Sequence, residues 1–185
     1  MRQPLLLALF LASCASAPAG PYQPPTESER DTGRAERLSR EAADLIPANL
    51  EEAERLLREA LTADLFHGPA HNNLGVVFLK QDRLYEAAQE FEWSKKLLPG
   101  LPDPRVNLGL VMEAAGRTDD ALGAYASALE VRSEHLPAIQ GAARLLVREG
   151  RQDARLAGWL EDIALRGTGE RWRAWAQQTR AARIE

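Results

Sequence analysis

Two small groups of residues in this sequence have the side-chain types that metal binding or hydrolysis needs. His67 and His71 are four residues apart, a spacing at which two imidazoles on one helix can bind a metal ion. Gly68 and Pro69 lie between them and no HExxH glutamate is present, so we predict a turn residue and a packing residue instead. Residues 133–135 are Ser-Glu-His, but chain neighbours do not converge as a catalytic triad does, and no Gly-x-Ser-x-Gly motif is present. Neither group predicts a catalytic or metal-binding site.

The sequence also lacks the motifs that hold nucleotides. It contains neither Gly-x-x-x-x-Gly-Lys-Ser/Thr nor Gly-x-Gly-x-x-Gly. Its formal net charge of −4 argues against nucleic-acid binding, which needs a basic surface. One cysteine in 185 residues excludes an internal disulfide and a multi-cysteine metal site. We therefore predict a protein that is not an enzyme and that has no cofactor, no nucleic-acid partner and no small-molecule substrate.

The single cysteine stands just after an apolar run near the start of the chain. Residues 5–11 (Leu-Leu-Leu-Ala-Leu-Phe-Leu) follow Arg2 and are too few to span a bilayer, which takes about 20 apolar residues. A short apolar run of this kind is typical of a secretory signal. The sequence Leu-Ala-Ser-Cys at 11–14 resembles a bacterial lipobox. The resemblance implies that residues 1–13 are a lipoprotein signal peptide and that Cys14 carries fatty acyl chains such as palmitate.

Ordinary signal cleavage at Ala-Ser-Ala, residues 15–17, is the alternative, although Pro18 would be unfavourable next to that cut. Under the lipobox interpretation, Ala15 stands where an aspartate would favour inner-membrane retention. The resemblance then implies an outer-membrane lipoprotein that faces the periplasm, if the organism has two membranes. Two or more acyl chains hold a protein firmly on a membrane. Residues 14–33 are rich in proline and small polar residues, so we predict a flexible tether that reaches on the order of 50 Å.

After the tether, the sequence matches itself when it is shifted by thirty-four residues. The matched positions carry Leu-Gly-x-x-large and then Ala-x-x-x-aromatic. They are Leu74, Gly75, Phe78, Ala87 and Phe91 in one unit, and Leu108, Gly109, Met112, Ala121 and Tyr125 in the next. This pattern resembles the tetratricopeptide repeat, a helix–turn–helix unit that stacks into a solenoid. The resemblance implies an all-α, right-handed α-solenoid over residues 34–167, with residues 168–185 as a C-terminal capping helix.

Small residues in this pattern allow the two helices of one hairpin to approach closely. Gly75 and Ala87 are the small residues of the central unit, and we expect Phe78 and Phe91 to fill the space between that hairpin and its neighbours. A bulky residue at either small position would cost about 1–3 kcal/mol through overpacking. The pattern weakens in the terminal units, where Arg40-Glu41 and Ala142-Ala143 replace Leu-Gly.

Several polar residues have the types and positions that start a helix. Asn49 with Glu52 three residues later predicts an N-cap pair. Asp103 before Pro104 predicts a cap followed by a first-turn proline, and Thr118 predicts a further cap.

The last predicted helix has only a narrow apolar stripe. Trp172 and Trp175 are three residues apart and therefore lie on one face of that helix. We favour packing of this face against the last hairpin. An exposed aromatic pair that contacts a partner or lipid headgroups is the alternative.

The resemblance implies a concave groove lined by the first helix of each unit, at positions just before and after Leu-Gly. The mapped residues are Asn72, Asn73, Val76, Leu79 and Lys80, then Val106, Asn107, Leu110 and Glu113, then Gln140, Arg144, Val147 and Arg148.

Within this set, each side-chain type has a role that we can predict. Asn73 and Asn107 can pair with a peptide backbone, because an amide both donates and accepts. The apolar members form a floor for anchor side chains, and Arg144 with Arg148 can receive a carboxylate. The set is not the full carboxylate clamp of chaperone-binding relatives. The alternative for the asparagines is that this residue is simply common before Leu-Gly in the repeat.

Together these features predict a membrane-anchored scaffold or assembly factor that binds a partner polypeptide in its groove. Lipoproteins of similar make-up serve in pilus-secretin assembly, outer-membrane-protein insertion and protease adaptation, and we favour pilus or secretion machinery. The alternative is an adaptor that presents substrates to a periplasmic protease or a cell-wall hydrolase.

Overall fold

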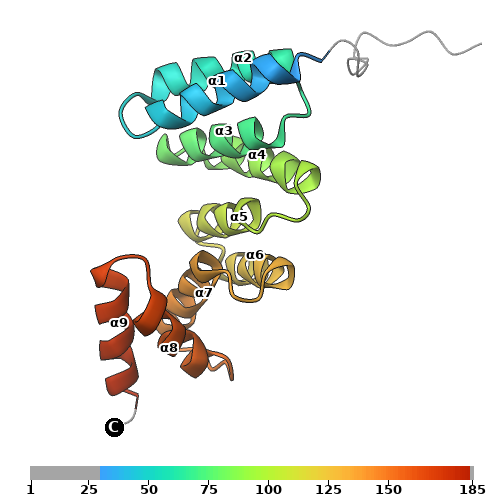
Figure 1. The fold of residues 1–185 in the computed structure, drawn as a ribbon. Helices are drawn as coiled ribbons and strands as arrows, with labels where there is room; N and C mark the ends of the chain where they lie inside the picture. Colours follow the sequence, from blue (N-terminus) through green and yellow to red (C-terminus); the bar gives the residue numbers. More distant parts are fainter. Residues whose placement is uncertain (1–29, 184–185) are drawn as a thin grey trace, which may run out of the picture.

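The computed structural model describes residues 30–183, which form nine α-helices and no β-strand (Figure 1). The helices are α1 (Thr32–Leu45), α2 (Leu50–Ala63), α3 (Gly68–Lys80), α4 (Leu84–Leu97), α5 (Asp103–Ala114), α6 (Thr118–Val131), α7 (Leu136–Arg148), α8 (Leu156–Arg166) and α9 (Glu170–Ala181). None of them is long and apolar enough to cross a membrane.

The helices pair into four hairpins that stack in chain order. α1 packs on α2, α3 on α4, α5 on α6 and α7 on α8, and each second helix also contacts the first helix of the following hairpin. The first helices contact one another in the series α1, α3, α5, α7, which Figure 1 shows along one side of the stack. α9 packs on α8 at the C-terminal end. The predicted all-α solenoid of helical hairpins is therefore confirmed.

In the central hairpins, the glycine of the repeat pattern lies directly against an aromatic ring of the second helix. A Cβ atom added to Gly75 would lie 2.6 Å from Cε1 of Phe91, and one added to Gly109 would lie 2.5 Å from Cε1 of Tyr125. Both rings are fully buried. In each of these two hairpins, the glycine of the first helix thus leaves the space that the aromatic ring of the second helix occupies.

Tyr125 also contacts a glycine that the repeat pattern did not single out. A Cβ atom on Gly141 would lie 2.5 Å from Cζ of Tyr125, so the ring is held between Gly109 of its own hairpin and Gly141 of the next. In the fourth unit the Leu-Gly positions are Ala142-Ala143, and the glycine stands two residues earlier than the period requires.

The helix starts agree only in part with the predicted caps. Asn49 Oδ1 accepts a hydrogen bond from the Glu52 amide at 3.2 Å, which confirms that cap. Asp103 and Thr118 were wrongly assigned as caps, because each is the first residue inside its helix and neither α5 nor α6 has a side-chain cap bond. His67 provides an additional cap, since its Nδ1 accepts from the backbone amide at the start of α3.

The folded part begins earlier than the predicted boundary at residue 34. Asp31 caps α1 by accepting from the Arg34 amide at 2.8 Å, and its own amide donates to Ala63 at 2.9 Å. Arg30 makes two hydrogen bonds to the buried carboxylate of Asp64, at 2.7 and 3.0 Å. This guanidinium holds the pKa of Asp64 below its ordinary value, although burial opposes the shift. Residues 30–33 therefore belong to the first hairpin, while Cys14 and the rest of the predicted tether lie outside the described residues.

The two tail tryptophans contribute to the packing of the C-terminal end. Trp172 and Trp175 are both partly buried and pack against a core cluster that includes Leu160 and Ile163 of α8. Their rings meet edge to face, with centroids 5.5 Å apart and an interplanar angle of 88°. These contacts agree with the packed interpretation of the α9 stripe.

Candidate partner-binding face

The predicted groove residues lie on α3, α5 and α7, the first helices of three consecutive hairpins. We call the side of the stack formed by α1, α3, α5 and α7 the first-helix face. Most of the predicted residues keep some exposure there, and Lys80, Leu110 and Arg148 are the most exposed among them. The half-buried members are Asn72, Asn73, Val76, Leu79, Asn107, Glu113, Arg144 and Val147.

Two predicted residues do not belong to this surface. Val106 is only 7% exposed and packs in a cluster with Ala138 and Ala142 of α7. Gln140 is 4% exposed, and its Oε1 accepts a hydrogen bond from Thr168 at 3.2 Å. Both side chains point along the stack toward the next element, so the prediction that they line a groove is wrong.

The asparagines connect neighbouring hairpins along the first-helix face. Asn107 Nδ2 donates to Asn72 Oδ1 at 2.9 Å, and Asn73 Nδ2 lies 3.4 Å from the Ser39 carbonyl oxygen. Each amide therefore has a structural partner in an adjacent hairpin. This favours a packing role for asparagine before Leu-Gly.

The apolar part of the face is concentrated at its N-terminal end. Val76 and Leu79 are half-buried over the first core cluster, and Leu110 is 36% exposed. Leu45 of α1 and Ile46, which directly follows this helix, are partly buried and extend this apolar strip. They stand thirty-four positions before Leu79 and Lys80. We did not predict these two residues, because the first unit lacks Leu-Gly, but the same shift by thirty-four identifies them.

The charged end of the face is already paired within the chain. The guanidinium of Arg144 forms an ion pair with Glu113, and it lies 5.9 Å from the ring centroid of Trp172. Arg148 pairs with its neighbour Glu149 at 2.9 Å. Arg144 is therefore not an unpaired cation, and a partner carboxylate would have to share it with Glu113, so the carboxylate site at Arg144 and Arg148 stays a prediction. Burial, with the Glu113 carboxylate nearby, also raises the pKa of Tyr125 behind this pair.

The two histidines that suggested a metal pair have separate partners. His71 is buried, with Nδ1 2.6 Å from a carboxylate oxygen of Glu90 and Nε2 2.8 Å from the Leu65 carbonyl oxygen. Its ring stacks on Trp93 at a centroid distance of 5.8 Å. His67 caps α3, as described above. The two imidazoles thus act as a packing residue and a turn residue.

The comparisons with known proteins agree with this architecture. No family model matches the chain, and no curated protein matches it. Among solved structures, PilF of Pseudomonas aeruginosa is similar with a TM-score of 0.67 and 21% identity, over 82% of this chain and 74% of that one. A thermophilic TPR protein of Thermus thermophilus matches with a TM-score of 0.67 and 17% identity, over 80% of this chain and 82% of that one. The first TPR of Spaghetti, bound to an HSP90 peptide, matches with a TM-score of 0.61 and 14% identity, over 66% of this chain and 98% of that one.

At these identities the comparisons establish the fold. The chain is an all-α solenoid of helical hairpins, and its fold is that of the tetratricopeptide-repeat proteins. Proteins of this fold include peptide binders, as the Spaghetti complex illustrates.

Proposed function

We propose that this protein is a scaffold that holds a segment of a partner polypeptide on its first-helix face. The observation that carries the proposal is the apolar strip of Val76, Leu79 and Leu110, which stays partly exposed beside the amides of Asn72 and Asn107. Apolar anchors with a few polar groups that orient the backbone are the usual composition of a peptide-binding surface. A structural neighbour with a bound peptide supports this use of the fold.

The partner segment that fits this face has apolar anchor side chains rather than a free terminal carboxylate. Its anchors contact the N-terminal end of the face, where the apolar residues of α1, α3 and α5 are concentrated. At the other end, the Arg144 guanidinium already forms an ion pair with Glu113, so a terminal carboxylate would have to share it. An internal segment of the partner, extended or helical, meets these requirements.

We also propose that this scaffold acts in the cell envelope. Lipidation at Cys14 would attach the scaffold to the outer membrane, facing the periplasm, with residues 15–29 as its tether. Pilus or secretion assembly is the favoured setting, because lipoproteins of similar make-up serve there. The similarity to the PilF structure is compatible with this setting.

The anchor is tested by Cys14→Ala. We expect the variant to lose incorporation of a labelled fatty-acid precursor and to move from the membrane fraction to the soluble fraction of the envelope. The physical reason is that the acyl chains supply the membrane affinity, at about 0.8 kcal/mol for each buried CH₂ group. Label incorporation and membrane partitioning that match the unmodified protein would contradict the lipobox assignment.

The binding face is tested by placing charge on the apolar strip. We expect Val76→Glu combined with Leu110→Glu to reduce partner capture from detergent-solubilised envelope by at least about tenfold, because a carboxylate cannot be buried unpaired against an apolar anchor. Leu165→Glu is the matched control, since Leu165 is 72% exposed on α8. Circular dichroism checks that helicity is kept.

The outcome of this capture experiment also separates the two settings. A pilus or secretin component in the captured material supports the assembly role, while a protease or cell-wall hydrolase supports the adaptor role. Capture that is equal for the double variant and the Leu165→Glu control would move the binding site away from the first-helix face.

A further inference from the structure

On the side of the stack opposite the first-helix face, three hairpins carry an arginine at the same position of the repeat. Arg83, Arg117 and Arg151 are thirty-four residues apart, and each stands between the two helices of its hairpin, before α4, α6 and α8. We call the three junctions that these arginines face the first, middle and third seams. Each seam lies between the second helices of two consecutive hairpins.

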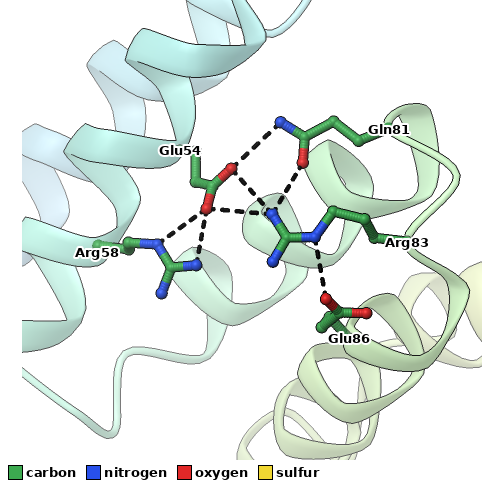
Figure 2. Close-up of polar contacts among 5 residues, drawn as sticks. All are labelled: Glu54, Arg58, Gln81, Arg83 and Glu86. Atoms are coloured by element: carbon green, nitrogen blue, oxygen red, sulfur yellow. Dashed lines mark hydrogen bonds and ion pairs between the residues drawn. The ribbon is translucent and has the colours of Figure 1, made fainter.

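The first seam is closed by a carboxylate from the preceding hairpin. Figure 2 shows Glu54 of α2 accepting hydrogen bonds from Arg58, Gln81 and Arg83, at 2.7, 3.2 and 3.3 Å. Arg83 also binds Glu86 of its own helix at 3.0 Å. Its guanidinium lies 4.1 Å from the ring centroid of Phe78, so the polar network covers a buried aromatic ring.

The third seam is bridged in a similar way. Arg151 Nη1 lies 2.5 Å from a carboxylate oxygen of Asp119, which stands in the first turn of α6. In both seams, therefore, the arginine that precedes the second helix binds a carboxylate of the hairpin before it.

The middle seam lacks this carboxylate. The position that corresponds to Glu54 is Ala88, and the position that corresponds to Asp119 is Tyr85. Arg117 is paired only with Asp120 of its own helix, at 2.7 Å, among the residues that the structure describes. The Arg117–Asp120 pair corresponds to the Arg83–Glu86 pair of the first seam. No carboxylate of the preceding hairpin corresponds to Glu54, because Ala88 stands at that position.

The middle seam also contains open space. Two adjoining cavities of about 400 and 280 Å³ lie along it and share Glu92, Leu108 and Met112, and Met112 stands at the position of Phe78. The third seam has a cavity of about 300 Å³ that is lined by Arg151. The aromatic side chains of Tyr85 and Trp93 line the first cavity and are 73% and 45% exposed. The second cavity is lined by the cations Lys95, Arg105 and Arg117 and by the carboxylates Glu92 and Asp120. Glu92 pairs with Lys95 and Asp120 pairs with Arg117, so Arg105 is the cation of this lining that has no acidic partner among the described residues.

We propose that the middle seam is a docking site for a segment of a partner protein in which an acidic side chain adjoins a bulky apolar one. The carboxylate binds Arg117 and so takes the place that Glu54 has in the first seam. The apolar side chain enters the cavity over Met112, beside Tyr85 and Trp93. This site is on the opposite side from the first-helix face and is independent of the function proposed above.

The first seam suggests a substitution that should block this site in the middle seam. Ala88→Glu places a carboxylate at the position of Glu54, where it can pair with Arg117 and fill the seam from within. A library of random peptides selected on the full folded chain, with Ala88→Glu used for counter-selection, should enrich sequences in which Asp or Glu is adjacent to a large apolar residue. Recovery of no such sequences would overturn the proposal.

The Kd of the enriched peptide for variants of the chain then tests the role of Arg117. We expect Arg117→Gln to raise the Kd by on the order of tenfold, because the variant loses a hydrogen bond between two charged groups. Arg171→Gln removes the same charge from an exposed site on α9 and should leave the Kd unchanged. Replacing the peptide's acid with its amide should weaken binding as much as Arg117→Gln does. Equal affinity for the unmodified chain, Ala88→Glu and Arg117→Gln would also overturn the proposal.

Discussion

Replacing Gly109 with valine is expected to lower the free energy of unfolding by about 3 kcal/mol, at the upper end of the usual range for overpacking. The added Cβ would lie 2.5 Å from Cε1 of Tyr125, well inside van der Waals contact. The ring cannot move away, because Gly141 bounds it at the same distance on the side of the next hairpin. Urea denaturation followed by circular dichroism measures the change.

A second glycine provides the control for this prediction. Gly123 lies in α6, and a Cβ atom added there would have no neighbour within 4 Å. Gly123→Ala should therefore stabilise the protein by about 0.5–1 kcal/mol, the difference in helix propensity between the two residues. A urea midpoint for Gly109→Val that equals that of the unmodified chain would show that the ring does not fill this space.

The sequence predicted that the helices of one hairpin approach closely at the glycine, but it did not predict that the ring of the second helix lies on that glycine. Gly109 and Tyr125 are both members of the thirty-four-residue pattern, yet we expected the aromatic rings to fill the space between neighbouring hairpins. Gly141 is outside that pattern. It contacts Tyr125 across a junction between hairpins in a unit that has lost Leu-Gly, and only the stacked structure brings the two together.

The errors in the predicted groove have the same physical origin. Val106 and Gln140 are buried because they contact the next element along the stack, the α7 alanines and Thr168 respectively. Asn72 occupies the equivalent position and contacts Asn107, but it stays half-buried on the face. The family pattern gives the positions around Leu-Gly, but exposure depends on what the next hairpin, or the loop before α9, places against them. The Arg144–Glu113 pair was missed for a related reason, because its members are thirty-one residues apart and meet only across two first helices.

Removing the Tyr125 side chain is expected to have the largest effect of any single truncation in the stack. The ring is 0% exposed and fills the space between α5, α6 and α7, so Tyr125→Ala should cost about 3–5 kcal/mol. Tyr125→Phe separates the ring from its hydroxyl. The buried Oη makes no hydrogen bond of ordinary geometry within the described chain, so its removal should change the stability by less than about 1 kcal/mol. Equal losses for Ala and Phe would show that the hydroxyl, near Glu113 and Arg144, carries the effect.

Combining the two changes tests whether glycine and ring form one packed unit. Tyr125→Ala opens a cavity beside Gly109, and the valine of Gly109→Val can then occupy part of it. The double variant should therefore lose at least about 2 kcal/mol less than the sum of the two single losses, since residues in contact are coupled. Additive losses would mean that Gly109 and Tyr125 affect stability through separate contacts. The nesting of hairpins on glycine and alanine would then need a different physical explanation.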